Sequence, residues 1–222
     1  MLALLAGCSP EPPVIVAVEH CQDVRVVGDV DLVLEQGPVQ QLSVPVADQH
    51  AVQVEQDADA NRLVLSGQST DSVILNCDCL EALNLRGNSD VAISGNLACP
   101  LEQVYVYGSS RLAGADMVFD ELELRAAADA QVALNDIDAE NIRLYAVGRA
   151  QVALAGQAAR FEVQASAASA VAASDLISQT VTVDAAGTSR VAVHATAHLS
   201  VARKEGADIA QSGTAPMEQK AE

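Results

Sequence analysis

The chain has 222 residues, a length that suits one domain or two small ones, and half of its residues are apolar, so it can bury a core. Valine, alanine and leucine dominate, while the chain has no tryptophan and only two phenylalanines and three tyrosines. The formal net charge of −18 excludes a sequence-independent grip on nucleic acid, which needs clustered lysine and arginine, and disfavours anionic membrane surfaces as electrostatic partners.

The N-terminus has the pattern of a bacterial lipoprotein signal. Residues 2–7 are apolar but too few to span a bilayer, so residues 1–7 are interpreted as the remnant of a signal peptide. The sequence LAGC at residues 5–8 resembles the site at which lipoproteins are cleaved and lipidated, which implies a lipid on the thiol of Cys8. Ser9 stands where an aspartate would favour inner-membrane retention, so the resemblance implies the outer membrane.

The next part of the chain divides into a tether and a set of short strands. Residues 8–20 are expected to form an extended tether after the lipidated cysteine, because residues 9–13 contain three prolines and a glutamate. Short segments of alternating apolar and polar residues then predict strands that form the first, wider coils of the domain and cap one end. These segments are Val24–Gly37, Gln41–Val46, Ala51–Gln56 and Arg62–Gly67.

From Leu83 onward the sequence repeats. Each repeat begins with an apolar-x-apolar pair, continues through glycine, alanine or serine, and returns to a second apolar-x-apolar pair. Consecutive second pairs begin 21, 20, 20, 19 and 20 residues apart, and such regular spacing is the signature of stacked structural repeats. The second pairs begin at Val91, Leu112, Val132, Val152, Val171 and Val191.

Within each repeat the apolar residues recur every second position, which is the period of a strand and not of a helix. Two short strands in about twenty residues predict an all-β solenoid over residues 21–202, with coils stacked at about 4.8 Å and alanine and serine at narrow corners. An antiparallel sandwich also alternates, but the constant repeat length favours the solenoid. The pattern fades after about Ile209, so residues 203–222 are expected to form a disordered C-terminal tail.

Three segments carry a family resemblance. VRVVGDVDLVLEQG at 24–37, RLVLSG at 62–67 and LEALNLRGNSDVAISG at 80–95, with its later copies, resemble the head GIN domain of auto-transporter adhesins, a bacterial domain of unknown function. The resemblance covers roughly residues 20–202, although alanine replaces many glycines from Leu122 onward. It implies a right-handed β-helix-like solenoid and a cell-envelope location, and it implies no catalytic residues.

Four cysteines remain besides Cys8, an even number that suits disulfides in an oxidising compartment. Cys79 and Cys99 are 20 residues apart, which is one coil, and positions stacked at about 4.8 Å lie within the range that a disulfide bridges. We therefore predict the pairs Cys79–Cys99 and Cys21–Cys77. Cys77 and Cys79 would share one face of an extended segment, so exchanged pairings, buried free thiols or a Cys-x-Cys metal or redox site are alternatives.

Other polar pairs are weak candidates for metal binding. Two histidines four residues apart could share zinc on a helix, but a strand and turn need not bring them together. Two aspartate pairs lack the glycine-bearing loop of known calcium sites. We expect solvated side chains at these positions, no metal and no cofactor. The positions are His194 with His198, Asp57 with Asp59, and Asp136 with Asp138.

The sequence has no nucleophile elbow, P-loop or dinucleotide fingerprint. It favours a non-enzymatic, lipid-anchored protein of the bacterial envelope, a scaffold that binds or adheres to an unknown protein or glycan partner and touches the membrane through its lipid. The alternative is a β-helix enzyme that acts on polysaccharides, which would require arginine and aspartate to converge in a groove. Its arginine candidates are scattered, and the chain has few aromatic residues for sugar stacking. The candidates are Arg86, Arg111, Arg125, Arg143, Arg149 and Arg190.

Overall fold

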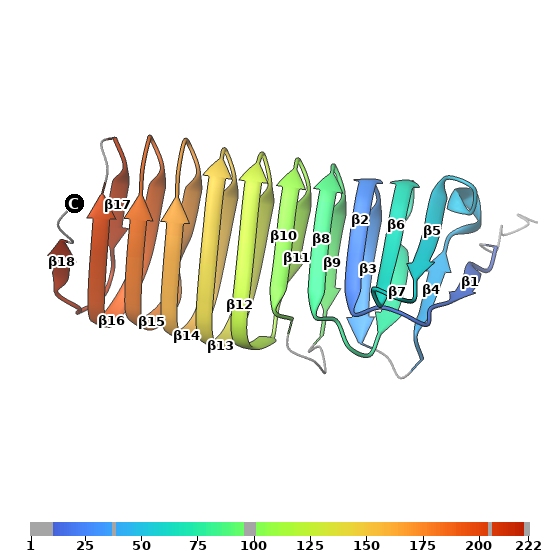
Figure 1. Cartoon of the computed structure of the whole chain (residues 1–222), viewed down its shortest axis with the longest axis horizontal. Coiled ribbons are helices and arrows are strands. Elements are labelled where there is room, and N and C mark those ends of the chain that lie inside the picture. The colour runs from blue at the N-terminus through green and yellow to red at the C-terminus, as the bar shows by residue number, and fades with distance from the viewer. Residues whose placement is uncertain (1–10, 37–38, 96–100, 204–205, 220–222) are drawn as a thin grey trace, which may run out of the picture.

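The computed structural model describes residues 11–36, 39–95, 101–203 and 206–219, which form one elongated stack of β-coils (Figure 1). Within this described part, no helix has the length and apolarity that crossing a membrane requires. The elements are β1 (Val14–Ala17), β2 (Asp23–Asp29), β3 (Asp31–Gln36), β4 (Gln41–Val44), the short 3-10 helix η1 (Val46–Asp48), β5 (Val52–Asp57), β6 (Arg62–Gln68), β7 (Val73–Cys77), β8 (Ala82–Gly87), β9 (Asp90–Ser94), β10 (Gln103–Gly108), β11 (Arg111–Gly114), β12 (Met117–Ala128), β13 (Gln131–Gly148), β14 (Gln151–Ala165), β15 (Ala170–Ala185), β16 (Arg190–Arg203), β17 (Asp208–Gln211) and β18 (Met217–Gln219).

The predicted ladder of second pairs is present, which confirms the β-solenoid and its coils of about twenty residues. The six positions lie in register on parallel strands, each one directly above the next, and all are buried. Stacking like on like keeps every coil the same width, and small branched side chains fill that width without clashing with the coil above. In order along the stack they are Val91, Leu112, Val132, Val152, Val171 and Val191.

Each complete coil has two broad sides and a narrow one. In β13, residues 131–134 belong to what we call the rear sheet, residues 137–139 to the narrow side, and residues 141–148 to the front sheet. The chain bends between the first two at Asp136, which has a φ of 51°. The front sheet faces the viewer in Figure 1 and runs through β6, β2, β8, β10 and the later parts of β12 to β16.

Alanine is not confined to the corners, which corrects our expectation. Outward positions of the rear sheet carry a continuous row of alanines in register across the coils. Short side chains are tolerated there because outward positions contribute little to the core. The row consists of Ala92, Ala113, Ala133, Ala153, Ala172, Ala192 and Ala210.

The coils are not stacked in chain order at the N-terminal end. The coil formed by β2 and β3 lies between the coil of β6 and β7 and the coil of β8 and β9 (Figure 1). The intervening β4 and β5 run antiparallel to β7 and β6, and β1 runs antiparallel to β4. These antiparallel strands cap the end of the stack as expected, but they also show that residues 14–17 belong to the domain and not to a tether.

A disulfide and a buried carboxylate fasten this end. Cys21 and Cys77 are bonded, with Cα atoms 6.1 Å apart, which confirms that predicted pair and ties the start of β2 to the end of β7. Asp48 is buried and accepts hydrogen bonds from the amide and hydroxyl of Thr70 and from the amide of Asp71. Burial alone would raise the pKa of Asp48, but these hydrogen bonds outweigh it and hold the pKa below its usual value.

The C-terminal segment adds a last coil, so our expectation of a disordered tail from residue 203 is wrong for β17 and β18. Ile209 stacks on Val191, and Met217 stacks on Leu199. The sequence pattern is weak here because the neighbouring stacked positions are polar glutamines instead of valines. Hydrogen bonds between backbones complete the strands without an apolar repeat.

Candidate functional site

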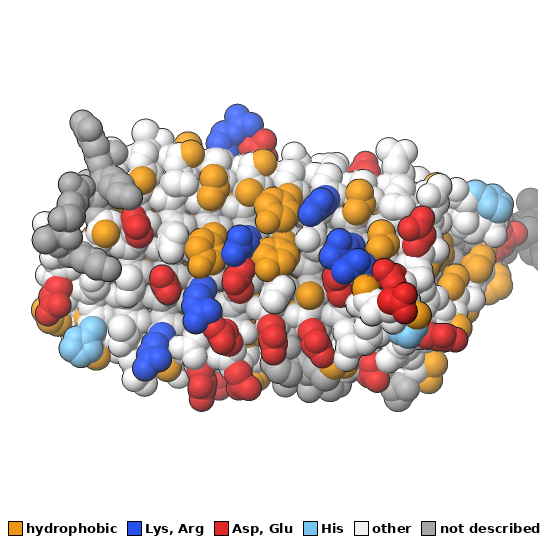
Figure 2. Space-filling view, in the orientation of Figure 1, with side chains coloured by type: hydrophobic (Ala, Val, Ile, Leu, Met, Phe, Trp, Pro, Cys, Tyr) orange, Lys and Arg blue, Asp and Glu red, His pale blue; other side chains and the backbone are white. Residues whose placement is uncertain are grey.

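All three tyrosines of the chain lie on the outward side of the front sheet, although they are far apart in the sequence. Both phenylalanines are buried in the core, so every aromatic side chain outside the core gathers here. Figure 2 shows hydrophobic and arginine side chains together over the middle of this sheet. We call the group the tyrosine–arginine face, and its members are Arg86, Tyr105, Tyr107, Arg125 and Tyr145.

The coil register builds this face. Tyr105, Arg125 and Tyr145 occupy the same position in three successive coils. The guanidinium carbon of Arg125 therefore lies 5.7 Å from the ring centre of Tyr105 and 4.8 Å from that of Tyr145. Arg86 lies 5.8 Å from the ring centre of Tyr107, and the rings of Tyr105 and Tyr107 are stacked with centres 6.4 Å apart. Each cation–π contact stabilises the arrangement by about 0.5–1 kcal/mol.

Polar contacts fix the side chains in place. Arg125 Nε donates to Glu123 Oε1 at 2.7 Å, and the Tyr105 hydroxyl lies 3.2 Å from the Oε1 atoms of both Glu123 and Gln103. Burial and then the charge of Glu123 raise the pKa of Tyr105, so its hydroxyl stays protonated at neutral pH. The hydrogen bond to Glu123 also raises the pKa of Arg125, which therefore stays charged.

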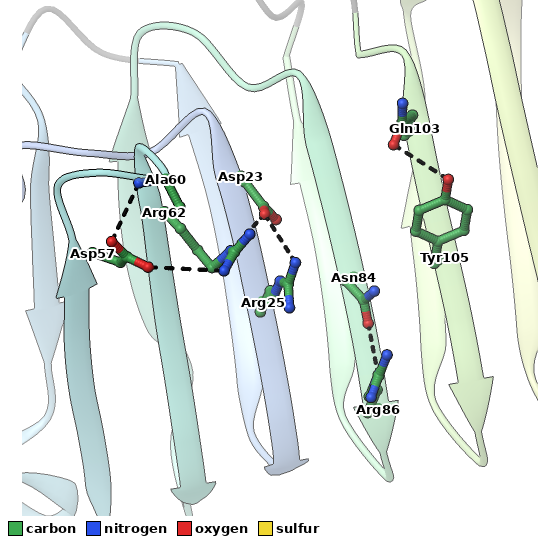
Figure 3. A network of polar contacts seen from close by, with 9 residues as sticks. All are labelled: Asp23, Arg25, Asp57, Ala60, Arg62, Asn84, Arg86, Gln103 and Tyr105. Atoms are coloured by element: carbon green, nitrogen blue, oxygen red, sulfur yellow. Dashed lines mark hydrogen bonds and ion pairs between the residues drawn. The ribbon is translucent and has the colours of Figure 1, made fainter.

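The neighbouring residues extend this ordering along the sheet (Figure 3). Arg86 Nε donates to Asn84 Oδ1 at 3.1 Å. Asp23 accepts from Arg62 at 2.6 Å and from Arg25 at 3.3 Å. The side chains of this sheet are thus held before any partner arrives, which lowers the entropy lost on binding.

Exposed aliphatic side chains flank the tyrosine–arginine face. Val27 lies beside Arg86 in the register and is 40% exposed. On the other side, Tyr107 pairs with Ala127, which pairs with Val147, and Val147 is 48% exposed. Apolar, aromatic and cationic groups thus form one continuous strip that crosses five neighbouring strands.

Carboxylates border the tyrosine–arginine face at the start of the same strands, where Glu123 contacts Tyr105 and Arg125. A groove of about 380 Å³ is lined by four acidic residues, Gln103 and Arg143, and the arginine forms an ion pair of 2.5 Å with Glu121. A second groove of about 480 Å³ follows on the narrow side and shares one of these acids. The acids of the first groove, which we call the acidic border, are Glu102, Asp120, Glu121 and Glu123.

The six arginine candidates of the alternative enzyme are scattered over the coil, as the sequence indicated. Arginines from different repeats occupy different positions within the repeat. They therefore lie on different sides of the coil. Three lie on the front sheet, two on the rear sheet and one at the turn after β13. In that order they are Arg86, Arg125 and Arg143, then Arg111 and Arg190, and Arg149.

The remaining predicted sites have mixed outcomes. Among the described residues, the one cluster of potential metal ligands is Cys21, Cys77 and Asp78, but its two sulfurs are joined in a disulfide and offer no thiolate. Cys79 is also disulfide-bonded. Its predicted partner Cys99 and the predicted lipidation site Cys8 lie outside the described residues, so both assignments stay predictions.

The tyrosine–arginine face was not predicted from the sequence, because the small number of aromatic residues concealed their shared place in the repeat. The signal was available. When the repeats are aligned on the second apolar-x-apolar pair, the residues seven positions before it form a column of Asn84, Tyr105, Arg125 and Tyr145. Outward columns of a solenoid are surfaces, so an aromatic column is a candidate contact.

Solved structures share this fold. A "putative adhesin" from Parabacteroides distasonis superposes with a TM-score of 0.70 at 16% identity, covering 93% of this chain and 91% of that one. A "Putative lipid binding protein" from the same species gives 0.65 at 14% identity, covering 96% and 93%. A "putative adhesin" from Bacteroides fragilis gives 0.60 at 14% identity, covering 93% and 95%.

No curated protein matches the chain. Comparison with protein families gives a match over residues 21–215, which spans almost all of the stacked coils. The chain therefore belongs to the family described as "Putative auto-transporter adhesin, head GIN domain".

Proposed function

We propose that the protein is a non-enzymatic, lipid-anchored scaffold of the bacterial envelope that binds a macromolecular partner through its tyrosine–arginine face. The observation that carries the proposal is the gathering of every non-core aromatic side chain, with two arginines, on one sheet of the solenoid. Tyrosine and arginine are among the residues that contribute most to binding at protein interfaces. The family name and the adhesin-like relatives support a role in binding.

The shape of the site supports a large partner. The strip runs across five strands of a continuous sheet, so a partner must also be extended to contact all of it. Because intramolecular contacts already order the arginines and Tyr105, binding costs little side-chain entropy. These properties suit a docking surface better than a pocket for a small molecule.

The groove beside the acidic border supports a polysaccharide-active enzyme less well than the tyrosine–arginine face supports a binding role. Such an enzyme would need an arginine or lysine free to act as a base beside acidic groups. Arg143, the arginine of that groove, is engaged in an ion pair with Glu121. Scaffold binding therefore remains the function that the geometry supports best.

The binding role can be tested with the full chain immobilised and exposed to solubilised envelope from its own bacterium. We expect a specific partner, identified by mass spectrometry, whose capture is lost when Tyr107→Ser and Val147→Ser are combined. Ile177→Ser is the matched control, because Ile177 is 50% exposed on the narrow side, away from the tyrosine–arginine face. Equal capture by both variants would contradict the proposal.

The anchor can be tested separately. Cys8→Ser removes the proposed lipid attachment point, and we expect the protein to move from the membrane fraction to the soluble fraction of lysed cells. Retention of the Cys8→Ser variant in the membrane fraction would show that the lipid does not hold the protein there.

A further inference from the structure

We propose that the tyrosine–arginine face docks a polypeptide segment in which basic side chains alternate with apolar ones. This inference rests on the proposed function, because it names the chemistry of the partner for the same face. It follows from three features of the surface, which are an exposed apolar strip, an excess of negative charge beside that strip, and tyrosine rings that are already covered by arginine.

The apolar strip needs a cover. Val27 and Val147 are 40% and 48% exposed on a strand face, and Arg86, Tyr107 and Ala127 lie between them in the register. An apolar strip bounded by polar residues on a soluble surface marks a contact site. Apolar side chains of a docked segment would remove Val27, Tyr107 and Val147 from water together.

The charges of the tyrosine–arginine face and its acidic border do not balance, because four carboxylates stand beside the three guanidinium groups of Arg86, Arg125 and Arg143. Arg125 is engaged by Glu123, and Arg143 by Glu121. Glu102 and Asp120 complete the acidic border, and within the described chain neither forms an ion pair.

The net charge of −18 adds a long-range field of the same sign. A partner with basic side chains is therefore attracted, whereas an acidic partner is repelled.

The tyrosine rings favour a polypeptide over a glycan. Sugars bind aromatic side chains by lying on an open ring face. Here Arg125 already lies over the rings of Tyr105 and Tyr145, and Arg86 lies over that of Tyr107. Apolar side chains need only the ring edges and the valine methyl groups, which a covering guanidinium leaves available.

The test uses the full chain and a fluorescent octapeptide of alternating lysine and leucine, followed by fluorescence anisotropy. We expect saturable binding that weakens as salt rises from about 0.05 M to about 0.5 M, because salt screens the acidic border. Combining Tyr107→Ser with Val147→Ser should weaken binding by about tenfold or more, as expected for central aromatic contacts. Combining Glu102→Gln with Asp120→Asn should weaken it and reduce its salt dependence.

Controls separate this inference from nonspecific attraction and from the proposed function. Ile177→Ser should leave affinity within about twofold of the wild-type value, since a distant surface change should not affect the contact. An octapeptide of alternating glutamate and leucine should not bind. Equal binding of both octapeptides, no binding of the lysine peptide, or equal loss in Ile177→Ser would overturn the inference. If the envelope partner captured through the same face proves to be a glycan, this inference fails while the proposed function stands.

Discussion

The corner of each coil offers a quantitative test of the stack. At one corner the chain turns through a residue with positive φ in coil after coil, and the residue is glycine at some levels and alanine at others. Gly28 has a φ of 113°, and a Cβ built on it would lie 2.2 Å from the carbonyl oxygen of Gly67 in the adjacent strand. Gly148 has a φ of 82°, and its Cβ would lie 3.1 Å from backbone atoms of Ala128.

The two substitutions to alanine should therefore differ. Gly28→Ala combines a backbone conformation that side chains rarely adopt with an overlap that only a shift of β2 from β6 can relieve, and we expect a loss of about 3–5 kcal/mol in the free energy of unfolding. Gly148→Ala should cost only about 1 kcal/mol, the usual price of a left-handed non-glycine residue. The neighbouring coils already accommodate Ala128 and Ala167 at φ of 64° and 61°.

Urea denaturation followed by far-ultraviolet circular dichroism measures the difference. With a slope of about 2–3 kcal/mol/M, the midpoint should fall by about 1.5 M for Gly28→Ala and by about 0.5 M or less for Gly148→Ala. Ala128→Gly is the control in the opposite direction and should leave the midpoint unchanged or raise it slightly. Equal losses for the two glycine substitutions would refute the idea that close stacking of coils sets the cost.

Three further predictions concern the core and the N-terminal cap. Ser110 is buried, and its hydroxyl has no hydrogen-bond partner among the described residues, so Ser110→Ala should raise the free energy of unfolding by about 0.5–1 kcal/mol in the same urea assay. Replacing Cys21 and Cys77 together by serine should lower it by about 2–4 kcal/mol, because the disulfide closes a loop across 56 residues, and a smaller loss would mean that the cap holds without it. Asp48→Asn should destabilise the protein at neutral pH, because hydrogen bonds outweigh burial and depress the pKa of Asp48. The advantage of the wild type is present above the unfolded pKa of about 3.9 and is lost as pH falls through the lower folded pKa, so thermal melts at pH 7 and at about pH 3 should show a shrinking gap.

The repeat explains how much of the fold the sequence could predict. Val132, Val152 and Val171 stack as expected because an identical inward position in every coil leaves a period that is visible in one sequence. The placement of β2 between β6 and β8 was not predictable in this way. Alternation shows which side of a strand is buried, but it carries no information on which strand lies beside it.

The candidate site and the C-terminal coil were missed for related reasons. Tyr105, Arg125 and Tyr145 are twenty residues apart in the sequence and become neighbours through the register of the coils. The outward column that they form varies in residue type from coil to coil, so it shows no obvious repeat. Ile209 is partly buried against the core and Met217 is 45% exposed, and the polar residues around them hide the period. Ladders of hydrogen bonds between backbones do not depend on side-chain identity, so the last coil forms where the sequence pattern has faded.

The central claim is that the solenoid presents its tyrosine–arginine face, and not its other sides, to a partner in the envelope. Site-specific photo-cross-linking in living cells tests this most directly, with the reactive amino acid placed at Val147 on the front sheet or at Ala133 on the rear sheet. We predict a discrete cross-linked species from position 147 that disappears when Tyr107→Ser is added, and none from position 133. The same species from both positions, or a species from position 133 alone, would contradict the account.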